Sequence, residues 1–252
     1  MRGLGTLQFP SAVTFFVGEN GSGKSTVLEG IAAAARLPAV GSADLARDAT
    51  LHAARTLGKA FHLTWEGGRS RRGFFLRAED FFGFTKRIAA QRAELQQELA
   101  DLPAQYAGRS EKALNLAAMP FRASLAAMET RYGADLDANS HGQSFIKLFQ
   151  SRFVPGGLHL LDEPEAPLSP HSQLGLVAML HDMVTQGAQF VIATHSPILM
   201  SFPGATIYTF DAQPVRSVPY DETEHVTVTR AFLNDPERYL RHLLDATRGA
   251  QA

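Results

Sequence analysis

Apolar residues along the chain fall into two patterns that alternate. Short runs that are almost wholly apolar, such as 13–17 (VTFFV) and 190–194 (FVIAT), are typical of parallel strands covered on both faces. Longer segments with an apolar residue every three or four positions, such as 26–36 and 173–186, indicate amphipathic helices. Strands that alternate with helices predict an α/β fold with a mostly parallel sheet.

Other segments extend this pattern. Residues 60–66 and 73–77 have strand-like sequences, and the glycines and arginines between them predict an antiparallel β-hairpin. The remaining expected elements are strands at 4–9, 158–161 and 206–210 and helices at 145–153 and 234–244.

The composition shifts to Ala, Leu, Gln and Arg over residues 85–132, and we expect residues 84–136 to form a small helical insertion. We expect Pro103 to end its first helical run and Pro120 to interrupt the second, 111–131. No heptad pattern persists, so a long coiled coil is not expected. Nothing else divides the chain, and we expect a single domain over residues 1–252.

Composition and charge narrow the class of protein. With 45% hydrophobic and 19% charged residues, the chain is expected to bury an ordinary core. Its formal net charge of −1 gives no general attraction to nucleic acid, and the absence of cysteine excludes disulfides and thiolate chemistry. The first residues lack the layout of a signal peptide, and no apolar run approaches the ~20 residues of a membrane span. We expect a cytoplasmic protein without direct membrane insertion.

The strongest chemical signal follows the first apolar run. Residues 18–26 read GENGSGKST and contain the phosphate-binding pattern G-x-x-x-x-G-K-S between a strand and a helix. In such a loop, backbone N–H groups and the helix dipole bind phosphates, Lys24 reaches the β- and γ-phosphates, and the Ser25 hydroxyl ligates Mg²⁺. The expected nucleotide-binding residues are Gly18, Glu19, Asn20, Gly21, Ser22, Gly23, Lys24, Ser25 and Thr26.

Two further motifs come directly after predicted strands. Asp162 and Glu163 follow 158–161, and neighbours on an extended chain point to opposite sides. We therefore expect Asp162 to face Mg²⁺ and Glu163 to face the γ-phosphate, where it acts as the general base for the attacking water. His195 follows 190–194 and is expected to contact the γ-phosphate or that water, although a lone histidine after a strand is more often structural.

The order of phosphate loop, helical insertion, S-x-G-Q, L-L-D-E-P and strand-plus-His resembles the ABC ATPases. Ser140-His141-Gly142-Gln143 looks like the core of that family's L-S-G-G-Q signature, although a polar helix N-cap with a glycine would read the same. The resemblance implies ATP and Mg²⁺ as ligands. It also implies a head-to-tail homodimer that sandwiches two ATP molecules, with Ser140 and Gly142 contacting the γ-phosphate bound to the other subunit.

The segment 162–170 (DEPEAPLSP) is similar to the soluble SMC/RecF-like, AAA-type branch of these ATPases, whereas transporter subunits usually read D-E-P-T-S-x-L-D. Several positions depart from the family pattern. His141 replaces a glycine, Ser169 replaces the D-loop aspartate, and Glu79 stands roughly where a metal- or water-binding glutamine is expected. Phe9 is an unsupported candidate for contact with adenine.

Three functions remain open at this point. The leading one is an ATP-driven switch in DNA repair, DNA maintenance or genome defence, favoured by the branch and by Arg69, Arg71 and Arg72, although such a cluster is more often a solvated turn. The second is an ABC-transporter subunit that docks on a membrane partner through the helical insertion. The third is a nucleotide-binding regulator with negligible turnover.

Overall fold

The fold is described from a computed structural model for residues 4–39, 52–66, 72–132 and 141–241. A six-stranded sheet has the order β2-β3-β4-β1-β5-β6. Its pairings are parallel except that between β5 and β6. These strands confirm the predicted α/β fold with a mostly parallel sheet. They are β1 Val13–Val17, β2 Gly73–Arg77, β3 Leu158–Asp162, β4 Gln189–Ala193, β5 Thr206–Thr209 and β6 Arg216–Ser217.

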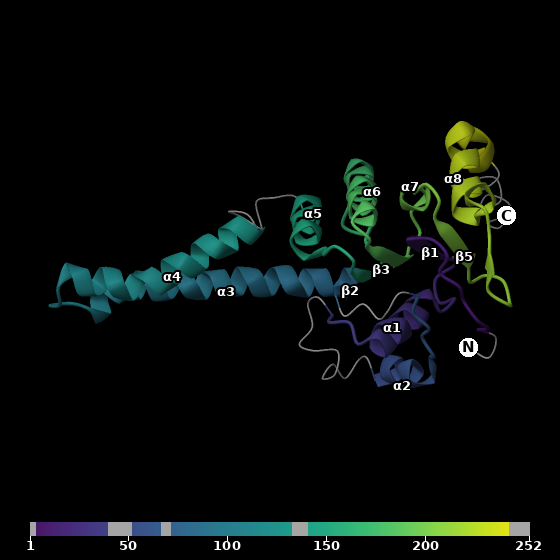
Figure 1. The fold of residues 1–252 in the computed structure, drawn as a ribbon. Coiled ribbons are helices and arrows are strands. Elements are labelled where there is room, and N and C mark those ends of the chain that lie inside the picture. Colours follow the sequence, from purple (N-terminus) through teal and green to yellow (C-terminus); the bar gives the residue numbers. More distant parts are fainter. Residues whose placement is uncertain (1–3, 40–51, 67–71, 133–140, 242–252) are drawn as a thin grey trace, which may run out of the picture.

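Helices cover both faces of the sheet. In Figure 1, α1 and α2 lie on one side, while α5, α6 and α7 lie on the other. The helices are α1 Lys24–Ala35, α2 His52–Ala60, α3 Ala78–Gln105, α4 Glu111–Tyr132, α5 His141–Arg152, α6 Pro170–Thr185, α7 Pro197–Met200 and α8 Glu224–Asn234. A 3-10 turn, η2 Tyr220–Glu222, precedes α8.

The central strand β1 explains why the sheet is buried on both faces. Val13, Phe15 and Val17 belong to the core on the α5–α6 side, and Phe16 belongs to the core beneath α1. Both phenylalanines have no exposed surface. Burying each such side chain contributes about 2 kcal/mol to folding. Side chains on both faces of β1 are therefore apolar, and their burial fixes the end of β1 between the two layers of helices.

The predicted helical insertion forms an arm of two packed helices, α3 and α4, which projects from the sheet (Figure 1). The arm begins at Ala78, directly after β2, so it starts earlier than expected. Pro103 lies in the last turn of α3, and Pro120 lies inside α4 without ending it. A proline removes one backbone donor from a helix, yet α4 continues through Pro120 while packed against α3.

Two predicted strands are wrong. Residues 4–9 and 61–66 contain no strand, and Gly73–Arg77 pairs in parallel with β3 rather than with a preceding hairpin partner. The alternation of Phe61, Leu63 and Trp65 arises because these side chains are half-buried against the core beneath α1. In this segment every second side chain is therefore partly buried, although the backbone is not paired with a neighbouring strand.

The C-terminal region differs in part from the prediction. Residues 236–241 are helical, and Asp235 Oδ1 accepts a hydrogen bond from the Arg238 N–H at 3.1 Å, as the capping pattern predicts. Helix α8 just before them was not predicted. Arg69 and Arg71 lie outside the described residues. Within the described part of the chain, no helix combines the length and the apolar character that a membrane crossing requires.

Candidate nucleotide site

The phosphate loop joins the central strand β1 to α1. Gly18, Gly21 and Gly23 all have positive φ angles, at 143°, 82° and 100°, which a residue without a Cβ adopts easily. The Gly23 carbonyl accepts the first helical hydrogen bond, from the Val27 N–H at 3.0 Å. The loop therefore ends with the N-terminus of α1 directed toward the edge of the sheet where the parallel strands end, which is an anion-binding arrangement.

Lys24 is only 4% exposed and folds back over this loop. Its Nζ donates hydrogen bonds to the carbonyl oxygens of Gly18, at 2.7 Å, and Glu19, at 2.8 Å. Burial lowers the pKa of the ammonium group, and the nearby carboxylates Glu163 and Asp211 oppose that effect. A cation buried beside a loop of backbone donors is suited to phosphate oxygens.

Asp211 supports the phosphate loop from the end of β5, and sequence reasoning missed it. Its Oδ1 accepts a hydrogen bond from the Glu19 N–H at 2.7 Å. A Cβ on Gly18 would lie 2.8 Å from the same oxygen, so this approach requires glycine. An acidic residue just past a predicted strand was the available signal, since parallel strands end at a common edge.

Ser25 and Asp162 are brought together from α1 and β3. The Ser25 hydroxyl donates to Asp162 Oδ1 at 3.0 Å. Burial raises the pKa of Asp162 to about 7; repulsion from Glu163 and Glu29 adds to this effect, while the Ser25 hydrogen bond and Lys24 oppose it. A hard cation would relieve this concentration of buried negative charge. Mg²⁺ commonly takes one or two protein oxygens and completes its shell with phosphate oxygens and water, so the pair fits that ion.

Glu163 departs from the extended geometry that the sequence predicts. Its φ is 48°, in the left-handed region, and its N–H donates to the Ala193 carbonyl at 2.9 Å. The turn leaves its side chain 45% exposed, with Oε1 3.6 Å from His195 Nε2. Glu163 and His195 therefore face each other across the ends of neighbouring strands β3 and β4.

Two residues that sequence reasoning did not assign hold His195. Its backbone N–H donates to Glu165 Oε1 at 2.7 Å, and its Nδ1 lies 2.9 Å from His225 Nε2. Burial raises the pKa of Glu165 and lowers that of His195, whose charge is further disfavoured by Lys24 and His225. Glu165 stands in the same acidic motif as Asp162, whereas nothing in the sequence links His225, on α8, to His195.

The remaining predicted site residues are less fully described. Ser140 lies outside the described residues, and for His141, Gly142 and Gln143 the structure describes the backbone, which forms the first turn of α5. Only the backbone of Glu79 is described, near the start of α3. Its neighbour Arg77 pairs in register with Asp162 and forms an ion pair with Glu29 at 3.2 Å.

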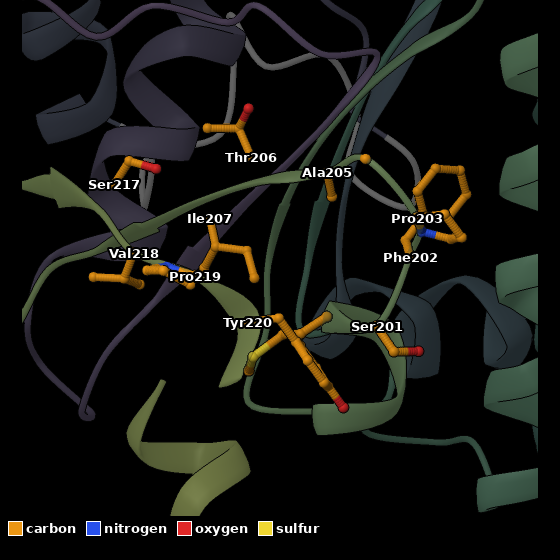
Figure 2. Close-up of a pocket in the computed structure, with 12 residues that line it drawn as sticks. Ser201, Phe202, Pro203, Ala205, Thr206, Ile207, Ser217, Val218, Pro219 and Tyr220 are labelled. Atoms are coloured by element: carbon orange, nitrogen blue, oxygen red, sulfur yellow. The ribbon is translucent and has the colours of Figure 1, made fainter. Parts of the chain in front are cut away.

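A separate cavity of about 520 Å³ lies near the start of β5, at the end opposite the phosphate loop (Figure 2). Phe202, Ile207, Val218 and Tyr220 contribute to its lining, which contains no charged side chain. Of the predicted site residues whose side chains the structure describes, none lines this cavity. Its uncharged lining does not suit a polyphosphate, so the charged edge of the sheet is the candidate nucleotide site.

A phosphate loop after the central strand and a Ser–Asp pair at the ends of parallel strands define a P-loop nucleotide-binding protein. A comparison with models of known protein families finds no match. Curated relatives include the macrolide export ATP-binding/permease proteins MacB of Escherichia coli K12 and of Shigella flexneri, each 25% identical over 229 residues. These residues cover 90% of this chain but 33% and 32% of those proteins, so the chain spans about a third of their length. Over most of its length the chain is therefore similar to proteins named as ATP-binding/permease proteins, and its sheet and phosphate loop are those of a P-loop nucleotide-binding fold.

Two solved structures show a more distant likeness. The protein cbiO1 from Clostridium perfringens, part of the ABC transporter complex cbiONQ, has a TM-score of 0.39 and 15% identity. The match covers 92% of this chain and 87% of that one. The SMC head domain from Thermotoga maritima has a TM-score of 0.27 and 22% identity over 34% of each chain.

Proposed function

We propose that this chain hydrolyses ATP at the edge of the sheet where β1, β3 and β4 end. One observation carries the proposal: a buried lysine on a phosphate loop, a Ser–Asp pair at 3.0 Å and a carboxylate 3.6 Å from an imidazole converge there. Catalysis of phosphoryl transfer depends mainly on positioning and on stabilising charge. This arrangement supplies both.

Binding of the triphosphate is assigned to the phosphate loop. Its backbone N–H groups and Lys24 hold the phosphate oxygens, and Lys24 exchanges its two carbonyl partners for them. Ser25 and Asp162 would hold Mg²⁺, and Glu79 is a further, weaker candidate. When bound, Mg²⁺ neutralises charge on the β- and γ-phosphate oxygens.

The hydrolytic step is assigned to Glu163 and His195. The Glu163 carboxylate takes a proton from water while the water oxygen forms a bond to the γ-phosphorus and the bond to the β–γ bridging oxygen breaks. His195 donates a hydrogen bond from Nε2 toward the γ-phosphate, whose negative charge a neutral N–H donor helps to hold. The 3.6 Å approach of His195 Nε2 to Glu163 supports the assignment of both groups to the same attacking water.

We further propose that the working site is shared between two copies of the chain. In this proposal Ser140, His141, Gly142 and Gln143, ahead of and within the first turn of α5, contact the γ-phosphate bound to the partner. ATP then joins two subunits, and hydrolysis lets them separate, which makes a nucleotide-driven switch.

Glu163→Gln tests the catalytic assignment. We expect ATP affinity, measured by calorimetry, to stay within about threefold, because the amide keeps the size of the side chain. Turnover falls by about 100-fold or more, since the amide accepts no proton. The control is Glu129→Gln, a similar change at an exposed position on α4, which leaves turnover unchanged. Unaltered turnover in Glu163→Gln would remove Glu163 as the base.

We propose a cytoplasmic location and consider two biological roles for the nucleotide-driven switch. The segment 162–170 (DEPEAPLSP) supports an ATPase of DNA maintenance or genome defence. The similarity to proteins named as ATP-binding/permease proteins supports, at least as well, a transporter subunit that acts with a membrane partner. Duplex DNA that raises the turnover of the pure protein favours the first. Turnover that is indifferent to DNA but changes with a co-purified membrane protein favours the second.

A further inference from the structure

One side chain outside the predicted motifs reaches the proposed catalytic histidine. His225, the second residue of α8, places its Nε2 2.9 Å from His195 Nδ1, and the two ring centres are 5.0 Å apart. His195 lies 30% exposed between this contact and Glu163. Both ring nitrogens of His195 thus face a defined neighbour.

The neighbours determine which nitrogen of His195 carries the proton. Glu163 is a carboxylate that only accepts hydrogen bonds, and its Oε1 lies 3.6 Å from His195 Nε2. A bare lone pair on Nε2 would face that oxygen with repulsion, so the proton belongs on Nε2. His195 Nδ1 is then an acceptor, and His225 must donate from its own Nε2.

The electrostatic environment favours the neutral form of both rings. Each ring then carries one proton, and the nitrogen that holds it determines which nitrogen donates and which accepts a hydrogen bond. Burial lowers the pKa of both histidines, and Lys24 lowers each further. The groups that oppose this are Asp211, on both rings, with Glu163 for His195 and Glu224 for His225. Two neutral imidazoles at 2.9 Å share one hydrogen bond, so the position of one proton fixes that of the other.

The segment that carries His225 is anchored to the loop that carries His195. The Tyr220 hydroxyl donates to the Pro197 carbonyl at 3.1 Å, two residues after His195. The Thr223 hydroxyl donates to the Tyr220 carbonyl at 2.8 Å, and Thr223 and Val226 are both 3% exposed. The start of α8 is therefore held in place beside His195.

From this geometry we infer that His225 is a positioning residue that holds His195 as its Nε2–H tautomer and aims that proton at the γ-phosphate. The inference rests on the proposed ATP hydrolysis. His225 touches neither nucleotide nor water in this account and acts only through His195, as outer partners of catalytic imidazoles do.

Steady-state kinetics with substitutions at position 225 test the inference. His225→Leu removes the donor, and we expect kcat to fall by about 10- to 100-fold with KM for ATP within about twofold. His225→Gln restores a donor near the position of Nε2, so most of kcat returns. His181→Leu, the same change at an exposed position on α6, serves as the control with unchanged kcat. A wild-type kcat in His225→Leu, or equal losses in the Gln and Leu variants, would overturn the assignment.

A double-mutant cycle separates positioning from general damage. In a His195→Ala background, His225→Leu is expected to cause no further loss of kcat, because its only route to the reaction is gone. Independent losses that multiply would show that His225 acts elsewhere and would contradict the inference.

Nitrogen NMR of His195 tests the same inference without turnover. The wild-type and His225→Gln proteins are expected to show the proton on His195 Nε2. In His225→Glu, measured near pH 8.5, the acceptor draws it to Nδ1. Identical nitrogen shifts in all three would overturn the inference even if ATP hydrolysis is intact. If the wild-type protein lacks turnover but its tautomer follows residue 225, the proposed function fails and the positioning role stands.

Discussion

At the scale of single residues, the backbone at Glu163 is strained, and this strain lowers the stability of the fold beside the proposed catalytic groups. A non-glycine residue at φ 48° is held there against its own preference, at a typical cost of about 1–2 kcal/mol. The hydrogen bond from its N–H to Ala193 fixes this turn and places the carboxylate beside His195. The proposed catalytic role would account for a glutamate in a conformation that does not suit it.

Replacing Glu163 with a residue that tolerates this conformation is therefore expected to stabilise the protein. Glu163→Asn raises the free energy of unfolding by about 0.5–1 kcal/mol, because asparagine adopts the left-handed region more readily, while turnover is lost. Chemical denaturation measures the first effect and an ATPase assay the second. Glu163→Gln, which keeps the strain, is the control and shows no gain in stability.

Buried His159 gives the fold a dependence on pH. The ring has no exposed surface and packs among Phe74, Phe153 and Phe190. Burial lowers its pKa to about 4 from an ordinary 6.5. Between these values the unfolded chain binds a proton that the folded chain does not. Stability from this residue is therefore full above about pH 6.5 and is lost as the pH falls to about 4, by about 3 kcal/mol in total.

His159→Phe isolates this effect. Asp162, with a raised pKa, contributes the opposite dependence over part of the same range, but it is present in both proteins and cancels in the difference. We expect the unfolding free energy of the variant minus that of the wild type to rise by about 3 kcal/mol between pH 7.5 and 4. A constant difference would show that His159 is protonated without cost.

The sequence predicted the parts of the site that lie within short motifs. The phosphate loop and Asp162–Glu163 carry their chemistry in adjacent residues, and the strands that deliver them are strongly apolar. Asp211 and His225 were missed because each reaches the site through tertiary packing, from the end of β5 and the start of α8. The turn at Glu163 was missed because the backbone conformation of a single residue produces no repeating pattern of apolar residues that could be recognised in the sequence.

At the scale of elements, β2 depends on a close approach that only glycine allows. Gly73 has φ 119°, and a Cβ there would lie 1.8 Å from the Leu158 carbonyl oxygen. A side chain would force β2 away from β3 at the point where their pairing begins. The arm follows β2 directly, so this pairing also supports α3.

Gly73→Ala is therefore expected to lower the unfolding free energy by about 3 kcal/mol or more, measured by denaturant titration. Gly83→Ala is the matched control, since that glycine lies in α3 with nothing near the position of its Cβ. There the better helix propensity of alanine adds up to about 1 kcal/mol. Equal effects at the two positions would contradict the steric account.

The hairpin prediction failed at this scale for a related reason. Alternating apolar residues at 61, 63 and 65 indicated a strand, but they lie against the core beneath α1 without ladder partners. Periodicity reports which side chains are buried. It does not report which backbone they pair with, and β2 instead joined a sheet that buries Phe74 on one face and Phe75 on the other.

At the scale of the whole molecule, the proposed shared site would make ATP turnover depend on the assembly of two subunits. We expect ATP turnover per subunit to rise with protein concentration until the dimer is saturated, because Ser140–Gln143 of one copy would complete the site of another. Size-exclusion chromatography of Glu163→Gln with ATP is expected to show a dimer, and with ADP a monomer. Turnover per subunit that is constant over a hundredfold range of concentration would contradict the shared site.

No connecting segment separates the sheet from the arm. β2 ends at Arg77 and α3 starts at Ala78, while Arg77 pairs in register with Asp162 and forms an ion pair with Glu29 on α1. A helix of 28 residues is about 42 Å long. A tilt of about 5° at Arg77 therefore carries the far end of α3 through about 4 Å. If nucleotide binding shifts Asp162, its register partner Arg77 would pass that shift to the base of the arm, and the movement would be largest at the far end of α3.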